Sequence, residues 1–244
     1  MELAGKKVLV TGGGSGIGLG IALALAREGC RVALSGRNEE KLRKAAAQFA
    51  GQPPILVRPC DVADRNDVGR LFAWLAEQGF EPLDVLVNSA GINVPRRKMA
   101  ELDPADWDRV VAVNLTGAFN CIHAALPGMR RQRDGWIVNV SSIAGKRAFV
   151  LGGAAYCAAK FGMTALGTEV GLEERPNGIR VTNVYPGEVD TPILEQRPVP
   201  VPPEKRAVMV HPEDIAACVV AIGRLPRHVL VPELVITPLY QEYA

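Results

Sequence analysis

Tyr156 and Lys160 carry the clearest chemical signal in this sequence. Residues 154–173 contain many small apolar side chains, which predicts a helix in which the two residues lie one turn apart on the same face. A tyrosine keeps its proton up to about pH 10 and is too weak an acid for efficient proton transfer near neutrality. A cation about 4 Å away, at an effective dielectric near ~20, favours the phenolate by about 4 kcal/mol, or roughly three pKa units. The spacing therefore predicts that Lys160 lowers the pKa of Tyr156 toward neutrality and makes it a general acid or base; the alternative is an exposed helical pair that occurs by chance.

A glycine-rich segment, Thr11–Gly18, follows the first predicted strand and precedes a helix. Glycines let the backbone approach a phosphate closely, and the amides at a helix start supply donors and a positive dipole end. Gly12, Gly16 and Gly18 form the pattern G-x-x-x-G-x-G, which differs from the stricter G-x-G-x-x-G fingerprint and lacks the G-K-[ST] ending of ATP-binding loops. The segment predicts a site for nucleotide phosphates, against the alternative of a glycine-rich turn without a ligand.

The length and composition of the chain fit one large α/β domain over residues 1–244. Of the 244 residues 48% are hydrophobic, which is enough for a substantial core. The Pro-rich run Arg197–Pro203 is the one candidate boundary, and the segment beyond it is too short to build a core of its own. We therefore expect a single domain.

Charge and cysteine content argue against several classes of protein. The net charge of +2 is small and its cations are dispersed, so no nucleic-acid or membrane surface is expected, and the clusters Arg96–Lys98 and Arg130–Arg131 are interpreted as solvated loops and helix ends. Five cysteines without a C-x-x-C pair indicate buried free thiols in a reducing compartment. Three scattered histidines argue against a metal site. Because the start of the chain lacks an apolar signal segment and no run approaches the length of a membrane span, we expect a cytoplasmic protein.

Short β-branched runs alternate along the chain with longer segments of helical periodicity. This order of β-α-β units predicts a parallel sheet with helices on both faces and ligands at the carboxyl ends of the strands. The predicted strands are Lys7–Thr11, Arg31–Ser35, Ile55–Arg58, Asp84–Asn88, Trp136–Val140, Arg180–Val184 and Leu234–Thr237.

Several motifs occur in a fixed order along nearly the whole chain. They are the glycine pattern, Asp61-Val62, Asn88-Ser89-Ala90-Gly91, Asn114, Ser142, the Tyr156/Lys160 pair, and Pro186-Gly187 followed by Thr191. With these motifs the chain resembles the short-chain dehydrogenase/reductase family of the single-domain type. The resemblance implies a doubly wound α/β Rossmann fold with seven parallel strands in the order 3-2-1-4-5-6-7, a nicotinamide cofactor, and a catalytic set made of Asn114, Ser142, Tyr156 and Lys160.

The resemblance also assigns the residues expected to contact the cofactor. It places Asp61 and Val62 at the adenine ring and the turn after the sixth strand at the nicotinamide; without it, Asp61 would be interpreted as a helix cap. It further implies that Asn114 distorts the helical stretch Trp107–Leu126 and supports a proton relay. The expected cofactor contacts are Gly12, Ser15, Gly16, Ile17, Gly18, Arg37, Asp61, Val62, Asn88, Ala90, Gly91, Tyr156, Lys160, Pro186, Gly187, Val189 and Thr191.

The end of the second predicted strand bears on the choice between NADP(H) and NAD(H). It reads Leu34-Ser35-Gly36-Arg37-Asn38, with no carboxylate to accept from the ribose hydroxyls or to repel a 2′-phosphate. Arg37 can pair with that phosphate through a charge-assisted contact. NADP(H) is therefore favoured over NAD(H), against the alternative that Arg37 is a surface cation beside Glu39 and Glu40.

Two departures from the family pattern concern the strand ends around the catalytic residues. Ser89 stands where relatives more often have a second asparagine. A serine can still hydrogen-bond to the backbone there, so we expect a small effect on how firmly this strand end is held and none on the chemistry. Ser142 precedes Tyr156 by 14 positions, one more than is usual, so the loop Lys146–Gly153 is expected to hold an extra residue over the substrate mouth. Ser141 remains a minor rival for the role of Ser142.

Two further departures concern the carboxyl-terminal third. Residues 192–210 occupy the place of the substrate lid, and the prolines there favour an extended polyproline conformation over helices. The tail Pro232–Pro238 lacks an Asp-Gly-Gly ending, so a dimer is better supported than a tetramer. The side chains considered for the substrate pocket are Phe149, Glu188, Asp190 and Arg197.

These patterns predict an NADP(H)-dependent oxidoreductase, of the alcohol dehydrogenase or carbonyl reductase type, that interconverts a ketone or aldehyde and an alcohol by hydride transfer. Tyr156 is the predicted general acid/base, Ser142 binds the substrate oxygen, and Lys160 also holds the nicotinamide ribose. The alternatives are a 3-oxoacyl-(acyl-carrier-protein) reductase-like enzyme, a non-catalytic dinucleotide-binding regulatory or scaffold protein, and a sugar-nucleotide epimerase or dehydratase that uses the same Tyr/Lys pair. The expected partners are a small carbonyl or alcohol substrate, which the sequence does not identify, and further copies of the chain in a homodimer or homotetramer.

Overall fold

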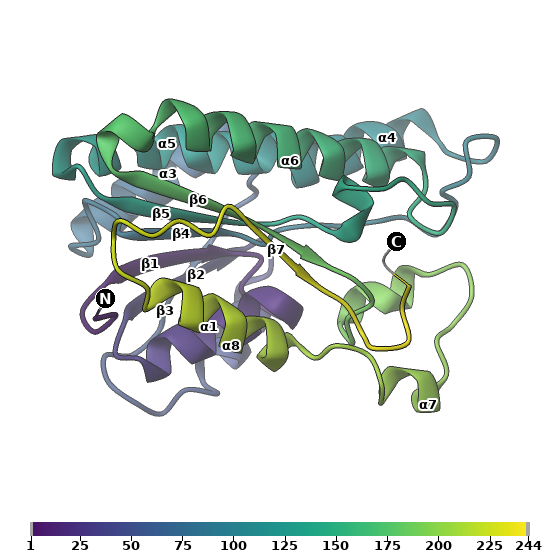
Figure 1. Ribbon diagram of the computed structural model, residues 1–244, viewed down its shortest axis with the longest axis horizontal. Coiled ribbons are helices and arrows are strands. Elements are labelled where there is room, and N and C mark those ends of the chain that lie inside the picture. Colours follow the sequence, from purple (N-terminus) through teal and green to yellow (C-terminus); the bar gives the residue numbers. More distant parts are fainter. Residues whose placement is uncertain (1, 243–244) are drawn as a thin grey trace.

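The computed structural model describes residues 2–242 as a sheet between two layers of helices (Figure 1). The first residue and the last two residues of the predicted domain lie outside the described residues. Seven parallel strands form one sheet in the predicted order β3-β2-β1-β4-β5-β6-β7. They are β1 (Lys7–Thr11), β2 (Arg31–Gly36), β3 (Leu56–Pro59), β4 (Val85–Asn88), β5 (Gly135–Val140), β6 (Ile179–Pro186) and β7 (Glu233–Ile236).

The strands lie where they were predicted, with ends that differ by one or two residues. The largest difference is at β6, which extends two residues beyond the predicted Val184 because Tyr185 and Pro186 pair with Val235 and Ile236 of β7. This extension carries the end of β6 to the edge of the sheet where a ligand is expected.

Helices cover both faces of the sheet (Figure 1). On one face lie α1 (Gly16–Arg27), α2 (Glu39–Ala46) and α8 (Pro212–Gly223). On the other face lie α3 (Arg65–Glu77), α4 (Pro104–Val111), α5 (Gly117–Gln132) and α6 (Ala154–Glu173), which has the predicted bounds. A short helix, α7 (Pro203–Arg206), stands apart in the segment between β6 and α8.

Alternate side chains of each strand enter opposite cores. In β1, Val8 and Val10 pack with α1 and α8, whereas Leu9 packs with α3 and α5. All three side chains are fully buried. Both faces of the strands are therefore apolar, as parallel strands between two helical layers require.

A row of asparagines crosses the centre of the sheet. Asn88, Asn139 and Asn183 stand in register on β4, β5 and β6. Asn88 Nδ2 donates to Asn139 Oδ1 at 3.0 Å, and Asn139 Nδ2 donates to Asn183 Oδ1 at 3.1 Å. A Cβ on Gly167 of α6 would lie 2.1 Å from Asn183 Oδ1, so the glycine lets α6 lie directly on this row. The asparagines thus fix three strands to one another and set the height of α6 above them.

One helical stretch, residues 104–132, is long and apolar enough to cross a membrane by length and composition alone. The expectation that no run reaches this length is therefore wrong. Half of its most apolar window is buried inside the protein, and the stretch belongs to the helical layer over β4 and β5. This placement is that of a core helix.

The cysteines are free, as predicted. Cys30, Cys60, Cys121 and Cys157 are buried, and Cys218 is half-buried. Burial raises the pKa of the Cys30 and Cys60 thiols to about 12, so they stay protonated and unreactive near neutrality.

Candidate active site

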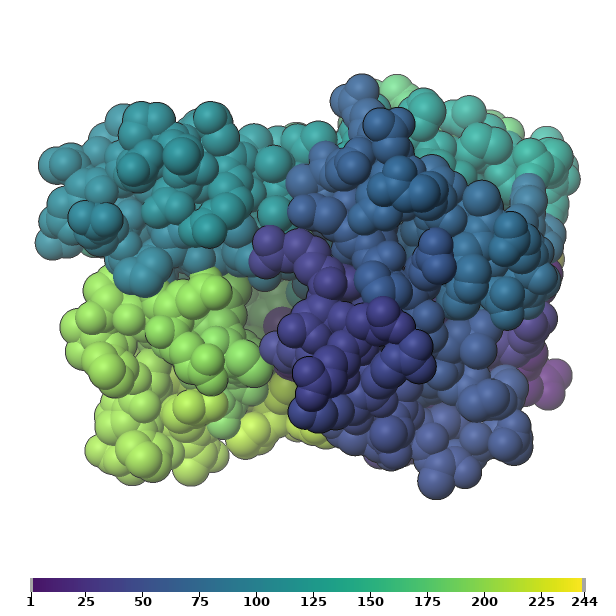
Figure 2. Space-filling model, turned by 180° about the vertical axis from the view of Figure 1, so that it is seen from behind, coloured from purple at the N-terminus to yellow at the C-terminus, as the bar shows by residue number. Residues whose placement is uncertain are grey.

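A cavity of about 940 Å³ opens at the carboxyl ends of the strands. Its mouth lies between the segment after β6, lime green in Figure 2, and the purple and blue segments of the first half of the chain. Doubly wound sheets bind ligands at this edge, and pockets for small molecules and cofactors measure about 300–1,000 Å³. The cavity has room for a large ligand.

Most of the residues predicted for the site line this cavity. They are Gly12, Ser15, Gly16, Ile17, Arg37, Asp61, Val62, Ala90, Gly91, Ser142, Tyr156, Lys160, Pro186, Gly187, Val189 and Thr191. Three others, Gly18, Asn88 and Asn114, lie behind its wall. Gly18 packs under the glycine turn, where a Cβ would be 2.7 Å from Gly12 O, and Asn88 belongs to the asparagine row. These two residues support the wall of the cavity.

The turn between β1 and α1 has the geometry of a phosphate site. Gly12 and Gly16 have φ values of +65° and +57°, and a Cβ on Gly12 would lie 2.7 Å from Ser89 O. Ser15 occupies the N-cap of α1, yet its side chain accepts no hydrogen bond from the helix. The first amides of α1 are therefore left to donate into the cavity, where a helix start favours an anion. This donor set and the close backbone approach fit the pyrophosphate of a dinucleotide.

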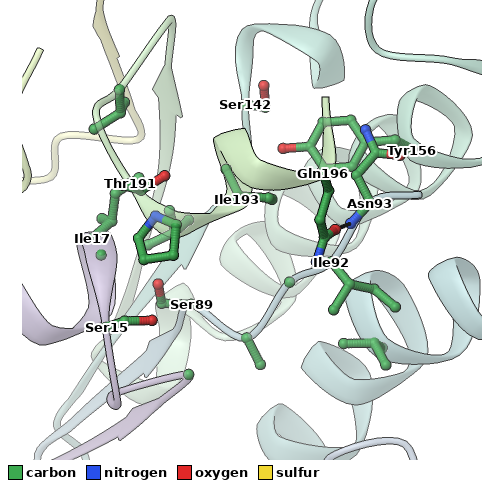
Figure 3. Close-up of a pocket in the computed structure, with 18 of the residues that line it drawn as sticks. Ser15, Ile17, Ser89, Ile92, Asn93, Ser142, Tyr156, Thr191, Ile193 and Gln196 are labelled. Atoms are coloured by element: carbon green, nitrogen blue, oxygen red, sulfur yellow. Dashed lines mark hydrogen bonds between the residues drawn. The ribbon is translucent and has the colours of Figure 1, made fainter. Parts of the chain in front are cut away.

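The two ends of the cavity bring together different chemistry (Figure 3). Ser15, Ile17, Ser89 and Thr191 lie on one side of the view, around the glycine turn. Tyr156 lies on the other side, beside Gln196 and Asn93. The cavity thus joins an anion-binding end to an end with an ionisable phenol.

Ser142, Tyr156 and Lys160 meet between β5 and α6. Ser142 follows β5, where its Oγ accepts from the Ala144 amide at 3.1 Å and also makes a hydrogen bond with Tyr156. Lys160 is 4% exposed, and its Nζ lies 5.7 Å from the centre of the Tyr156 ring. Lys160 Nζ donates to Val140 O, the last carbonyl of β5, at 2.8 Å.

The electrostatics of this group differ from the prediction. Removal of the phenol from solvent raises the pKa of Tyr156, and the hydrogen bond with Ser142 and the charge of Arg97 only partly oppose that rise. Burial lowers the pKa of Lys160 from 10.5 to about 8. The predicted net shift of the Tyr156 pKa toward neutrality is therefore wrong in direction, because burial of the phenol outweighs the effects that lower its pKa.

Asn114 distorts its helix, as the family resemblance implied. A π-helical turn, Ala112–Thr116, separates α4 from α5, with Asn114 fully buried at its centre. Asn114 Oδ1 accepts from the Ile92 amide at 2.7 Å, and its Nδ2 donates to Ile92 O at 2.9 Å. A Cβ on Gly91 would lie 3.5 Å from Asn114 Oδ1 and 3.7 Å from Lys160 Nζ. The amide and the ammonium therefore flank one point behind Gly91.

The geometry separates the two candidate serines. Ser141 Oγ donates to Lys160 O at 3.2 Å and contacts Thr164 Oγ1 at 3.3 Å, which ties it to α6. Ser142 is the serine that makes a hydrogen bond with the phenol of Tyr156. This contact supports Ser142, and not Ser141, as the serine that acts together with Tyr156.

The end of the cavity beside the end of β2 contains unpaired positive charge. Arg37 is exposed at the cavity edge and makes no ion pair within residues 2–242. Glu39 and Glu40 pair along α2 with Arg43 and Lys44, so neither neutralises Arg37. Lys41, which was not predicted, also lines this end.

The alternative interpretation of Asp61 as a helix cap is wrong. Asp61 Oδ1 accepts from the Ala63 amide at 3.0 Å in the turn before α3, while Asp64 is the N-cap of that helix. Asp61 and Val62 both line the cavity, on the side of Arg37 and Asn38.

The lid, residues 192–210, is more helical than predicted. Pro192 begins a 3-10 turn, Pro192–Gln196, and Pro203 begins α7, and extended backbone angles are found between them at Arg197 and Pro202. A proline at the first helical position loses no hydrogen bond, so these prolines start helical turns where polyproline was expected.

Ion pairs hold the lid against the end of β6. Glu188 contacts Arg197 at 2.9 Å and Lys205 at 3.1 Å, and Asp190 pairs with Arg206. Burial alone would raise the pKa of Glu188, but hydrogen bonds from Tyr240, Lys205 and Arg197 outweigh it and hold the pKa below its usual value. Phe149, Glu188 and Arg197 line the cavity as considered, whereas Asp190 does not.

Arg97 is buried, and its interpretation as part of a solvated cluster is wrong. It is 6% exposed, while Arg96 and Lys98 beside it are exposed. Arg97 donates to Val94 O at 2.7 Å, to Leu151 O at 3.0 Å, and to Gln196 O. The other cluster, Arg130–Arg131, lies at the exposed end of α5 as expected.

Asn93 and Gln196 are cavity residues that sequence reasoning missed. The Asn93 amide donates to Gln196 Oε1 at 3.0 Å, and Asn93 Nδ2 donates to Gly152 O at 3.1 Å (Figure 3). These bonds join positions 103 and 59 residues apart, so no local pattern could reveal them.

Comparison with known proteins assigns the family. The family model for short chain dehydrogenases matches residues 6–199, and the chain belongs to this family. An uncharacterized oxidoreductase of Staphylococcus aureus is 35% identical over 237 residues, which cover 97% of this chain and 99% of that protein.

Some solved structures of similar proteins contain NADP or an NADP derivative. An alcohol dehydrogenase from the archaeon Thermococcus sibiricus, complexed with 5-hydroxy-NADP, superimposes with a TM-score of 0.87 at 28% identity and covers 98% of this chain and 99% of its own. A metagenomic short-chain oxidoreductase in complex with NADP has a TM-score of 0.83 at 31% identity and covers 99% of this chain and all of its own. The protein is thus an oxidoreductase of a family whose similar structures hold a nicotinamide dinucleotide.

Replacing Gly12 by alanine is expected to abolish dinucleotide binding, because the new Cβ would meet Ser89 O at 2.7 Å in a backbone of positive φ. Titration of NADPH fluorescence measures the dissociation constant. Gly69→Ala is the matched control, since its Cβ would meet nothing within 4 Å and alanine favours helix α3. Unchanged NADPH affinity in folded Gly12→Ala protein would place the phosphates elsewhere.

Proposed function

We propose that the protein interconverts a ketone or aldehyde and an alcohol by hydride transfer with NADP(H), with Tyr156 as the general acid and base. The observation that carries this proposal is the cluster of Ser142, Tyr156 and Lys160 in the same cavity as the glycine turn. A phenol in contact with a hydroxyl and near an ammonium can bind a carbonyl oxygen and exchange a proton with it. A regulatory protein that only binds a dinucleotide has no need of this arrangement.

Each residue of the cluster has a separate task in reduction. NADPH, when bound, supplies the hydride to the carbonyl carbon. Ser142 donates a hydrogen bond to the substrate oxygen, and Tyr156 donates its proton to the same oxygen. The raised pKa of Tyr156 keeps the phenol protonated near neutrality, which suits the donor role. Lys160 stabilises the phenolate that remains, and Asn114 beside it supports the return of a proton from solvent.

The cavity residues divide into groups that would hold the parts of the cofactor. The glycine turn and the start of α1 fit the pyrophosphate, and Asp61 with Val62 fits the adenine. Pro186, Gly187, Val189 and Thr191, together with Lys160, would hold the nicotinamide riboside. Arg37 and Lys41 supply positive charge for a 2′-phosphate, which supports NADP(H) over NAD(H).

We further propose a cytoplasmic homodimer or homotetramer that acts on a small carbonyl or alcohol compound. Buried free thiols fit a reducing compartment. Phe119 of α5 and Phe161 and Leu172 of α6 are 38%, 41% and 50% exposed on the outer helical layer, which supports association through that face.

Tyr156→Phe is expected to lower kcat for carbonyl reduction by about 10²- to 10⁴-fold, the usual contribution of a positioned proton donor. The phenyl ring keeps the shape of the site, so the dissociation constant for NADPH should change little. A panel of ketones and aldehydes followed by NADPH absorbance, with fluorescence titration of NADPH, measures both quantities. Near wild-type turnover in this variant would remove Tyr156 from the mechanism.

Arg37→Gln is expected to lower the preference for NADP(H) over NAD(H) by about 10- to 100-fold, because a charge-assisted hydrogen bond contributes about 1.5–3 kcal/mol. The ratio of kcat/KM values for NADPH and NADH measures the preference. Arg43→Gln is the control, since Arg43 pairs with Glu39 on the same helix and does not line the cavity. An equal ratio in wild type and Arg37→Gln would assign the phosphate contact to another residue.

The rate of reduction should fall as the pH rises through about 8, the pKa of Lys160. Burial lowers this pKa, so the ammonium is present below about pH 8 and is lost above it, and with it the charge that stabilises the phenolate. Carbonyl kcat/KM is expected to be level up to this point and then to decline about tenfold per pH unit. A profile that stays level to about pH 9.5 would show that the charge of Lys160 is not needed.

A further inference from the structure

Arg97 is a buried cation in the cavity that the proposed reaction does not use. Its side chain is 6% exposed and lines the cavity within electrostatic reach of Tyr156. Its three backbone acceptors come from three loops, 93–97, 146–153 and the lid. The guanidinium is therefore held at a fixed place in the wall near the phenol.

No acidic side chain within residues 2–242 forms an ion pair with Arg97. Burial lowers the pKa of Arg97, and the positive charge of Arg197 lowers it further. Arg197 itself pairs with Glu188 at 2.9 Å. Glu188 also serves Lys205, so its charge is shared between two cations. Glu195, the other carboxylate that lines this region, is exposed to solvent. Positive charge is thus in excess beside Tyr156.

The hydrogen bonds of Arg97 leave part of its donor capacity unused. A guanidinium has five N–H groups, and three of them are engaged, one each at Nε, Nη1 and Nη2. One N–H remains on each terminal nitrogen. A guanidinium with a free N–H on both terminal nitrogens can donate to the two oxygens of a carboxylate.

Bracing of the loops does not by itself explain a charge at this position. Asn93, which is neutral, joins the same three segments through Gly152 O and Gln196 Oε1. Burial of an unpaired guanidinium is unfavourable, because the charge loses its hydration. An anion entering the cavity would remove that penalty, and an uncharged substrate would leave it in place.

We propose that the substrate carries a carboxylate and that Arg97 binds it, so that the protein reduces oxo acids or oxidises hydroxy acids. This inference rests on the proposed function and names its substrate class. Tyr156 and Ser142 bind the carbonyl oxygen while Arg97 holds the carboxylate at the other end of the molecule. A site built to bond a charged group discriminates strongly against an analogue that lacks it, since the buried donors are then left unpaired.

The test compares oxo acids with their methyl esters, which keep the carbonyl and lose the charge. The pairs are 2-oxobutanoate, acetoacetate and 4-oxopentanoate, each with its methyl ester. They differ in the number of carbons between the carbonyl and the carboxylate, so the series finds which spacing fits Tyr156 and Arg97. For the best pair, wild type should prefer the acid in kcat/KM by about 10- to 100-fold. Arg97→Gln should lose at least about tenfold of this preference, mainly through the KM of the acid, so that activity on the acid falls by more than activity on the ester.

Arg96→Gln is the matched control. It removes the same charge from the neighbouring position, where the side chain is exposed and outside the cavity, and should leave the acid-to-ester ratio unchanged. Arg97→Lys keeps the charge without the fork and should retain part of the preference. An Arg97→Gln protein that loses activity equally on acid and ester would show that Arg97 only braces the loops, and would overturn the proposal.

The wild-type protein alone also decides the question if the Arg97 variants do not fold, as judged by circular dichroism. Equal rates on acid and ester in every pair would overturn the proposal, and a preference for the acid would support it. Calorimetric titration of acetoacetate and methyl acetoacetate into protein saturated with NADP⁺ gives a readout without turnover. If no carbonyl is reduced but acetoacetate binds and its ester does not, the proposed reaction fails while the carboxylate site stands; if reduction occurs without discrimination, only the carboxylate site fails.

Discussion

The reaction centre depends on one buried ammonium group and the carbonyl that receives its hydrogen bond. Lys160 is 4% exposed, and its Nζ donates to Val140 O at 2.8 Å. Val140 is the last residue of β5 and directly precedes Ser141 and Ser142. A buried charge is stable only with close polar partners. Burial lowers the pKa of Lys160 to about 8, because the ammonium loses its hydration. The same contact joins α6 to the end of β5. The positions of Tyr156 and Ser142 relative to each other follow from it.

Two kinds of structure surround this centre. The sheet, the asparagine row and α6 form a rigid base in which most positions are fixed by buried hydrogen bonds. The lid and the loop 146–153 form a wall that depends on long-range contacts from Asn93 and Arg97. The base presents the groups that we propose for proton transfer and for the dinucleotide phosphates. The wall presents the groups that we propose to select the substrate, and the unpaired positive charge of Arg97 is its main chemical feature.

The fold and the chemistry at the strand ends could be predicted from the sequence because both depend on local signals. Strand and helix periodicity placed all seven strands and the bounds of α6, and the motifs after β1, β2, β5 and β6 placed most of the cavity lining. The environment of side chains could not be predicted in the same way. The flanking residues Arg96 and Lys98 make Arg97 look like a surface residue, and the direction of Lys160 depends on where α6 lies over β5. The prolines of the lid were misinterpreted because a proline starts a helical turn as readily as it extends a chain.

The attachment of the lid has a consequence for how such a protein can change over time. The chain leaves the sheet after Pro186, and an isolated β-bridge joins Val189 to Val210, so the two ends of the lid meet at one place. The ion pairs of Glu188 and Asp190 lie at this junction, outside the asparagine row. Insertions, deletions or exchange of this segment can therefore change the lining of the cavity while the positions of Ser142, Tyr156 and Lys160 are kept.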